Sequence, residues 1–196
     1  MRFRALAAAI VATLAAGLAA CSSGPAATSA APASSGSASA PADSAFPATV
    51  ATKFGGVTIN AKPTRVVALG WGDAETALAL GVQPVGASDW LGFGGEGVGP
   101  WAKGLYSTAP TLIGTMEPEY EKIAALKPDL ILDVKGSGDQ ARYERLKSIA
   151  TTVGVPAGGD SYLTNATQQM TMIATALGEK RSEERRVGKE CLRLCR

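Results

Sequence analysis

The chain has 196 residues, of which 46% are hydrophobic, with 19 basic and 17 acidic side chains and no histidine. The lack of histidine excludes Ser-His-Asp and Cys-His catalysis together with histidine-based metal sites. The length suffices for one ordinary hydrophobic core.

Residues 1–20 have the pattern of a bacterial lipoprotein signal peptide. Arg2 and Arg4 supply a basic start, and an uncharged Ala- and Leu-rich stretch follows. Leu18-Ala19-Ala20-Cys21 matches a lipobox, which predicts lipidation at Cys21. We therefore expect an exported protein, lipid-anchored on the outer face of the cytoplasmic membrane. An ordinary cleaved signal with an incidental cysteine stays open.

Residues 21–45 are mainly Ser, Ala, Gly and Pro with one charge, Asp43. Such a segment buries too little apolar surface to offset the entropy of ordering. It predicts a disordered tether, with a glycosylated stalk as the alternative.

Residues 46–180 are predicted to form one α/β layer. Strands are expected at 54–59 (as a hairpin or edge strand), 65–69, 85–87, 111–113, 130–132 and 152–153. Helices are expected from Asp73 as N-cap to Gly81, and at 120–126, 139–149 and 164–177. The alternation favours a Rossmann-like parallel sheet with helices on both faces.

The segment Tyr120–Lys135 indicates where a ligand would lie. A short helix ends at Lys127-Pro128, because proline disfavours helix at the residue before it, and the apolar run 130–132 then reads as a buried strand. In parallel sheets ligands bind at the carboxyl ends of strands. The candidate ligand-binding residues in loops at such ends are Trp71, Asp73, Trp90, Trp101, Tyr106, Lys135 and Ser137.

The three tryptophans of the chain all fall in two of these loops, which favours a platform for a bulky, partly planar ligand over tryptophans that cap the core. No G-x-G-x-x-G follows the first core strand, so a dinucleotide site is not supported. No catalytic motif and no metal-ligating set is recognised, and binding is the better supported class of function. A zinc or manganese receptor is disfavoured, because such metals usually recruit imidazole.

Residues 181–196 form a charged tail with a net charge of +3 that holds Cys191 and Cys195. Its segment SEERRVGKEC resembles translated vector or adaptor read-through, so we expect a non-native tail. We assign it no nucleic-acid partner and give its cysteines no role.

The chain resembles iron–siderophore substrate-binding proteins of ABC importers, a group that also holds cobalamin and haem receptors. The resemblance rests on Phe46–Gly86 and Tyr120–Leu132 and, less specifically, on GVGPWAKG at Gly97–Gly104. It implies two α/β lobes joined by a long helix, with the ligand held between them. It covers only 46–180, so we expect this chain to be the N-terminal lobe, without the connecting helix and second lobe. We therefore expect this fragment to bind ligand weakly or not at all.

The resemblance also implies the partners. The ligand would be a ferric siderophore recognised as a whole complex, so no protein cofactor is expected. An ABC permease and its ATPase would receive it, and Glu121 matches the motif position of a family glutamate that docks on the permease. The alternatives are a cobalamin or haem receptor, or an exported single-lobe enzyme or structural lipoprotein.

Overall fold

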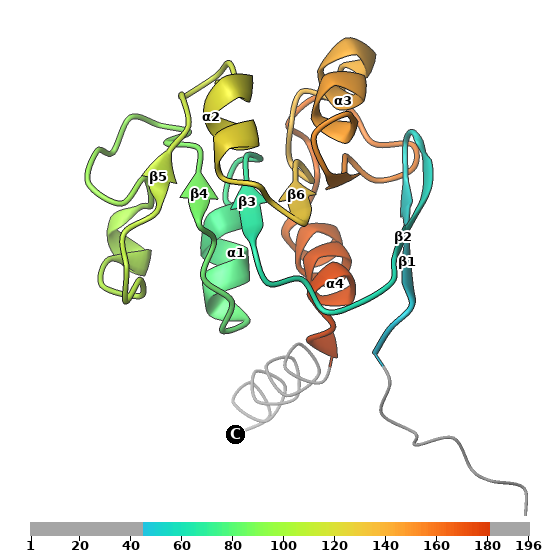
Figure 1. Ribbon diagram of the computed structural model, residues 1–196, viewed down its shortest axis with the longest axis horizontal. Helices are drawn as coiled ribbons and strands as arrows, with labels where there is room; N and C mark the ends of the chain where they lie inside the picture. Colours follow the sequence, from blue (N-terminus) through green and yellow to red (C-terminus); the bar gives the residue numbers. More distant parts are fainter. Residues whose placement is uncertain (1–44, 181–196) are drawn as a thin grey trace, which may run out of the picture. The chain divides into compact units, whose positions relative to one another are not determined.

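The computed structural model describes residues 45–180, which form a five-stranded parallel sheet, its helices and a two-stranded antiparallel sheet (Figure 1). The predicted signal peptide, the lipidation site Cys21, the tether before residue 45 and the tail 181–196 lie outside the described residues. No helix within 45–180 has the length and apolar character needed to cross a membrane.

The parallel sheet consists of β3 (Val66–Ala68), β4 (Gly86–Ala87), β5 (Thr111–Leu112), β6 (Leu130–Leu132) and β7 (Thr151–Val153). The helices are α1 (Asp73–Ala79), the 3-10 helix η1 (Pro100–Ala102), α2 (Tyr120–Ala125), α3 (Gln140–Lys147) and α4 (Ala166–Leu177). The antiparallel sheet pairs β1 (Ala48–Thr52) with β2 (Gly55–Ile59).

The strand order is β5-β4-β3-β6-β7, so the chain moves outward from β3 in one direction and then returns to the other side of β3. Val67 pairs with Gly86 of β4 on one side and with Ile131 of β6 on the other. This reversal is a topological switch point. In open α/β sheets, ligands bind outside the carboxyl ends of the strands at such a point.

Both faces of the sheet are covered, as the sequence predicted. Val66 packs in one apolar cluster with side chains of α1 and α4, such as Ile173. The next residue, Val67, packs on the opposite face with Ile123 of α2 and Leu146 of α3. Figure 1 shows α2 and α3 on one side of the sheet and α1 and α4 on the other. Successive strand residues point to opposite faces, so a sheet buried on both sides needs a continuous apolar run.

The segment Tyr120–Lys135 has the predicted structure. Helix α2 ends at Ala125, and β6 is buried throughout. Lys127 takes a positive φ of 46°, so the chain leaves the helix there and avoids the right-handed conformation that Pro128 disfavours.

One local prediction was wrong in detail and another was incomplete. The N-cap of α1 is Gly72, with φ 77°, and Asp73 is the first helical residue. The strand 54–59 is half of a hairpin whose other half, β1, was not predicted. Thr49 and Thr58 face each other across this hairpin, with their hydroxyl oxygens 3.2 Å apart.

Candidate ligand-binding site

Five aromatic side chains form a continuous row at the carboxyl edge of the parallel sheet, here called the aromatic row. Along it, ring centroids are separated by 4.5 Å (Tyr162 to Trp71), 5.6 Å (Trp71 to Trp90), 5.6 Å (Trp90 to Phe93) and 5.8 Å (Phe93 to Trp101). The first two pairs are stacked and the last two meet edge to face, both favoured geometries for aromatic rings. The row brings together loops that follow β3, β4 and β7.

Backbone hydrogen bonds hold Trp71 and Tyr162 against the loop that follows β6. The Trp71 amide donates to the carbonyl of Lys135 at 3.0 Å, and the Tyr162 amide donates to the carbonyl of Gly136 at 2.8 Å. The side-chain amide of Gln169 in α4 donates to the Trp71 carbonyl at 2.8 Å. Tyr162 has a φ of 56°, a conformation uncommon outside glycine. An aromatic residue in this conformation, stacked on Trp71, indicates that the loop is shaped to place the ring.

Two carboxylates organise the loop that follows β4. Glu75 of α1 accepts a hydrogen bond from the Trp90 indole nitrogen at 3.1 Å and from the Gly99 amide at 3.3 Å. Asp89 accepts from the amides of Phe93 and Gly94 at 2.7 and 2.8 Å. The glycine-rich loop that follows β4 is therefore tied at both its start and its middle.

The row is open to solvent at one end. Trp101 is 67% exposed and Phe93 is 37% exposed, while Trp71, Trp90 and Tyr162 are half-buried. The six exposed large apolar side chains within 45–180 all lie in the segments that follow β4, β5 and β7; they are Leu91, Phe93, Trp101, Leu105, Met116 and Leu163. Among them, Phe93 and Trp101 are in edge-to-face contact, and contiguous exposed apolar surface marks an interaction site.

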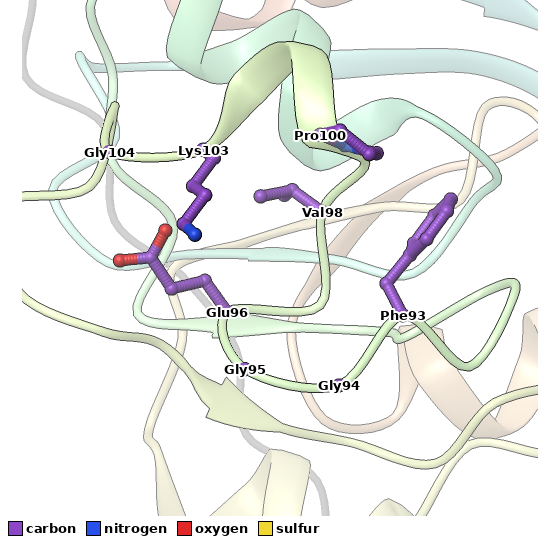
Figure 2. A pocket seen from close by; sticks show the side chains of 8 residues that line it. All are labelled: Phe93, Gly94, Gly95, Glu96, Val98, Pro100, Lys103 and Gly104. Atoms are coloured by element: carbon purple, nitrogen blue, oxygen red, sulfur yellow. The ribbon is translucent and has the colours of Figure 1, made fainter.

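A pocket of about 600 Å³ adjoins the exposed end of the row. It is lined by residues between Phe93 and Gly104 (Figure 2). The side chains of Glu96 and Lys103 project toward each other across it, and Val98 supplies an apolar wall. This volume lies within the range of small-molecule sites.

The structure brings Trp71, Trp90 and Trp101 together, as the prediction of a platform requires. Tyr162 was missed, although it lies in the loop that follows β7. Its loop lacks a tryptophan, and the 4.5 Å stacking that recruits Tyr162 to the row is a long-range contact.

Asp73 and Tyr106 do not belong to the exposed surface. Asp73 is 0% exposed, and its carboxylate accepts hydrogen bonds from the Val134 amide at 2.8 Å and the Gln169 side chain at 2.6 Å. Burial raises the pKa of Asp73 to about 7. Tyr106 is 7% exposed and packs in the apolar cluster beneath the loop, where burial and then the nearby Glu75 raise its pKa. Both are structural residues here, which corrects the expectation that they face the ligand.

Lys135 and Ser137 lie in the loop that follows β6, beside Trp71 and Tyr162. Lys135 is half-buried, and the Ser137 hydroxyl accepts from the amide of Asp139, the N-cap of α3, at 3.3 Å. Nothing in the structure tests their contact with a ligand, so their role stays a prediction.

A buried ion pair stabilises the base of that loop. Arg142 donates to both carboxylate oxygens of Asp133, at 2.7 and 3.0 Å. Burial lowers the pKa of Arg142, but its hydrogen bonds and charge interaction with Asp133 outweigh this, and the net effect is a raised pKa. The third donor contact of Arg142, to the Met116 carbonyl at 3.1 Å, joins the β5 and β6 loops.

Glu121 is exposed on the first turn of α2. It borders a shallow hollow of about 250 Å³ between α2 and α3, where the Arg145 guanidinium lies 3.8 Å from the Tyr120 ring centroid. This surface contains no member of the aromatic row. Residues 45–180 contain no group of three or more metal-ligating side chains placed to hold an ion.

A parallel sheet with a switch point and an aromatic surface at its carboxyl edge defines a ligand-binding α/β lobe. The chain belongs to the periplasmic binding protein family, whose model matches residues 66–189. The Fe(3+) dicitrate-binding periplasmic protein FecB of Escherichia coli (strain K12) is 29% identical over 143 residues, which are 73% of this chain and 46% of FecB.

Two crystal structures show the same likeness. A periplasmic solute binding protein from Mycobacterium smegmatis str. MC2 155 is 34% identical with a TM-score of 0.64, covering 70% of this chain and 49% of that one. Streptococcus pneumoniae TIGR4 PiaA in complex with ferrichrome is 29% identical with a TM-score of 0.61, covering 69% and 46%. The chain spans less than half the length of the curated relatives it matches.

Proposed function

We propose that this lobe is one wall of the ligand site of an ABC-importer substrate-binding lipoprotein that captures a ferric siderophore. The observation that carries the proposal is the aromatic row, which crosses the carboxyl edge of the sheet at the switch point of the strand order. The names of the relatives support it, because FecB is named for ferric dicitrate and PiaA was crystallised with ferrichrome.

The aromatic row would act by contact rather than by chemistry. A siderophore chelates iron completely, so the protein would bind the outer surface of the complex, add no iron ligand, need no cofactor and not act as an enzyme. Aromatic faces bury large areas of a bulky, partly planar ligand at low entropic cost, since their side chains have few rotatable bonds.

One lobe would supply only one wall of the site. The matched relatives are more than twice as long as the part this chain covers, which supports a second lobe closing over the ligand in a complete receptor. We expect this lobe by itself to bind weakly, because a ligand on an open wall keeps most of its surface in water.

The proposal also includes a location for the protein and the partners that it would meet there. Lipid on Cys21 would hold it on the outer face of the cytoplasmic membrane, and the exposed Glu121 would meet a cationic group of the permease, which works with its ATPase.

The test is a fluorescence titration of the purified chain with ferric siderophores, with haem and cobalamin as the alternative ligands. The three tryptophans of the chain all lie in the row, so a ligand seated there quenches the intrinsic emission. Because one lobe is expected to bind weakly, the titration extends to millimolar ligand. Quenching by haem or cobalamin but by no ferric siderophore would reassign the receptor, and quenching by none of them at that concentration would contradict the proposal.

Trp101→Ala supplies the site-specific arm of this test. Trp101 is largely exposed, so its removal leaves the core intact. Loss of one aromatic contact of about 0.5–1.5 kcal/mol predicts a two- to tenfold weaker Kd. Phe54→Leu is the control, because Phe54 stacks on Tyr143 outside the row with a centroid distance of 4.1 Å. Equal weakening by both variants would place the ligand elsewhere.

A further inference from the structure

Acidic side chains accompany the aromatic row along its length. Glu75 holds the indole of Trp90, and Asp89 holds the amide of Phe93. At the other end of the row, Asp160 lies two residues before Tyr162 in the same loop. None of these three carboxylates makes an ion pair with another residue of 45–180.

Acidic side chains outnumber basic ones at this edge, although Lys103 and Lys135 make no ion pair within residues 45–180. The loops that follow the five parallel strands hold seven acidic residues and two lysines; they are residues 69–72, 88–110, 113–119, 133–139 and 154–165. Lys103 faces Glu96 across the pocket in Figure 2. Two of the seven acids are paired, Asp133 with Arg142 and Glu119 with Lys122. Lys53 donates to the Gly138 carbonyl at 3.0 Å, a contact that leaves its charge in place.

Glu75 is the most informative of the acids. One carboxylate oxygen binds the Trp90 indole and the Gly99 amide, while the other is buried without a hydrogen-bond partner within residues 45–180. The Glu75 carboxylate therefore lies at the indole N–H edge of Trp90, in a setting with little water to screen its charge.

An aromatic face attracts cations through its quadrupole, and an adjacent carboxylate adds to that attraction. The same surface repels an anionic complex. Three hydroxamates, each singly charged, neutralise Fe³⁺, and a pendant amine makes the complex cationic. Three catecholates, each doubly charged, leave the complex with three negative charges.

We propose that the aromatic row and its carboxylates select ferric complexes without net negative charge, of the hydroxamate type, over ferric tris-catecholate and ferric citrate complexes. This selectivity rests on the proposed function and concerns the same site. Within the lobe, the row supplies stacking area and Glu75, Asp89 and Asp160 supply the charge that discriminates.

The first experiment reads the charge of the surface without any siderophore. Because all three tryptophans lie in the row, quenching of intrinsic fluorescence by iodide and by caesium reports the local potential there. Relative to N-acetyltryptophanamide and to acrylamide as a neutral control for exposure, we expect iodide to be at least twofold less effective than caesium. Salt at about 0.5 M should remove the difference, because the Debye length is then only a few ångströms. Iodide quenching equal to or stronger than caesium quenching would overturn the proposal.

Charge reversal tests whether acidic residues at the carboxyl edge of the sheet cause the difference between iodide and caesium quenching. Asp160→Lys should raise iodide quenching, because Asp160 is exposed beside Tyr162. Glu144→Lys is the matched control, since Glu144 is exposed on α3 outside these loops. The same change from both variants would show a non-local field and contradict the assignment.

The second experiment titrates the chain with ferrioxamine B (cationic), ferrichrome (neutral), ferric enterobactin (a tris-catecholate) and ferric citrate at low salt. We expect the first two to bind at least tenfold more tightly than the last two. Equal or tighter binding of the anionic complexes would overturn the selectivity and leave the proposed function standing. Failure of all four to bind at millimolar concentration would contradict the proposed function and the selectivity with it.

Discussion

Asp73 is a buried carboxylate whose protonation couples the stability of the lobe to pH. Burial is the main cause of its raised pKa, and the charge of Asp133 adds to it, while hydrogen bonds from Gln169 and the Val134 amide act in the opposite direction. The folded-state pKa of about 7 exceeds the ordinary aspartate value of 3.8, so the folded state holds the proton that the unfolded state releases. Stability from this group is therefore full below about pH 4 and is lost as pH rises to about 7.

Asp73→Asn should remove that pH dependence. Asn cannot ionise, so the fall in unfolding free energy between pH 5 and pH 7.5, which for one proton is at most about 1.4 kcal/mol per pH unit, should become smaller. Urea denaturation at the two pH values measures this, with Asp160→Asn as the exposed control. Equal pH slopes for the wild type and Asp73→Asn would show that Asp73 does not titrate in this range.

At the scale of elements, β4 depends on a glycine. A Cβ on Gly86 would lie 2.6 Å from the terminal methyl carbons of both Ile113 and Leu126, so the packing between β4 and α2 has no room for it. Gly86→Ala should lower the free energy of unfolding by about 1–3 kcal/mol, the usual cost of overpacking a core. Gly56→Ala in β2 is the matched control, because its Cβ would meet only Thr49, at 3.5 Å. Thermal or urea unfolding compares the two, and equal losses would refute the packing argument.

The helices and strands that could be predicted are those whose signal lies within a few neighbouring residues. Apolar runs at Val66–Ala68 and Leu130–Leu132 reflect strands buried on both faces, and Pro128 marks the end of a helix. Strand β1 was missed because it forms by pairing with β2, which is a tertiary contact. Buried and exposed residues alternate along Ala48–Thr52 in the structure, but its amino-acid types do not alternate clearly between apolar and polar.

Some features of the candidate site could likewise be predicted from the sequence, and others could not. The positions of its tryptophans at strand ends could be predicted, because parallel topology fixes where those ends meet. Three features could not be predicted, since each depends on contacts between residues distant in the chain. They are the burial of Asp73, the contact of Glu75 with Trp90 and the stacking of Tyr162 on Trp71.

At the scale of the molecule, ligand contact and permease contact would use different surfaces. The aromatic row lies in the loops that follow β3, β4 and β7, whereas Glu121 lies on α2 beside Arg145 of α3. A glutamate in the first turn of a helix is also favoured by the helix dipole, which gives Glu121 an alternative, structural role. The two roles predict different measurements, because a dipole contribution affects stability and a docking contact affects transport.

Glu121→Lys should lower uptake of ferric siderophore by cells whose receptor carries this lobe. Loss of one interfacial ion pair of about 1 kcal/mol corresponds to roughly fivefold weaker docking, and repulsion by the new charge adds to it. Ligand affinity should not change, because Glu121 is not part of the aromatic row. Glu144→Lys makes the same charge change on α3 and should leave uptake unaltered. Unchanged uptake with a lowered melting temperature would assign Glu121 to helix stability, and reduced uptake with weaker ligand binding would place it within the ligand site.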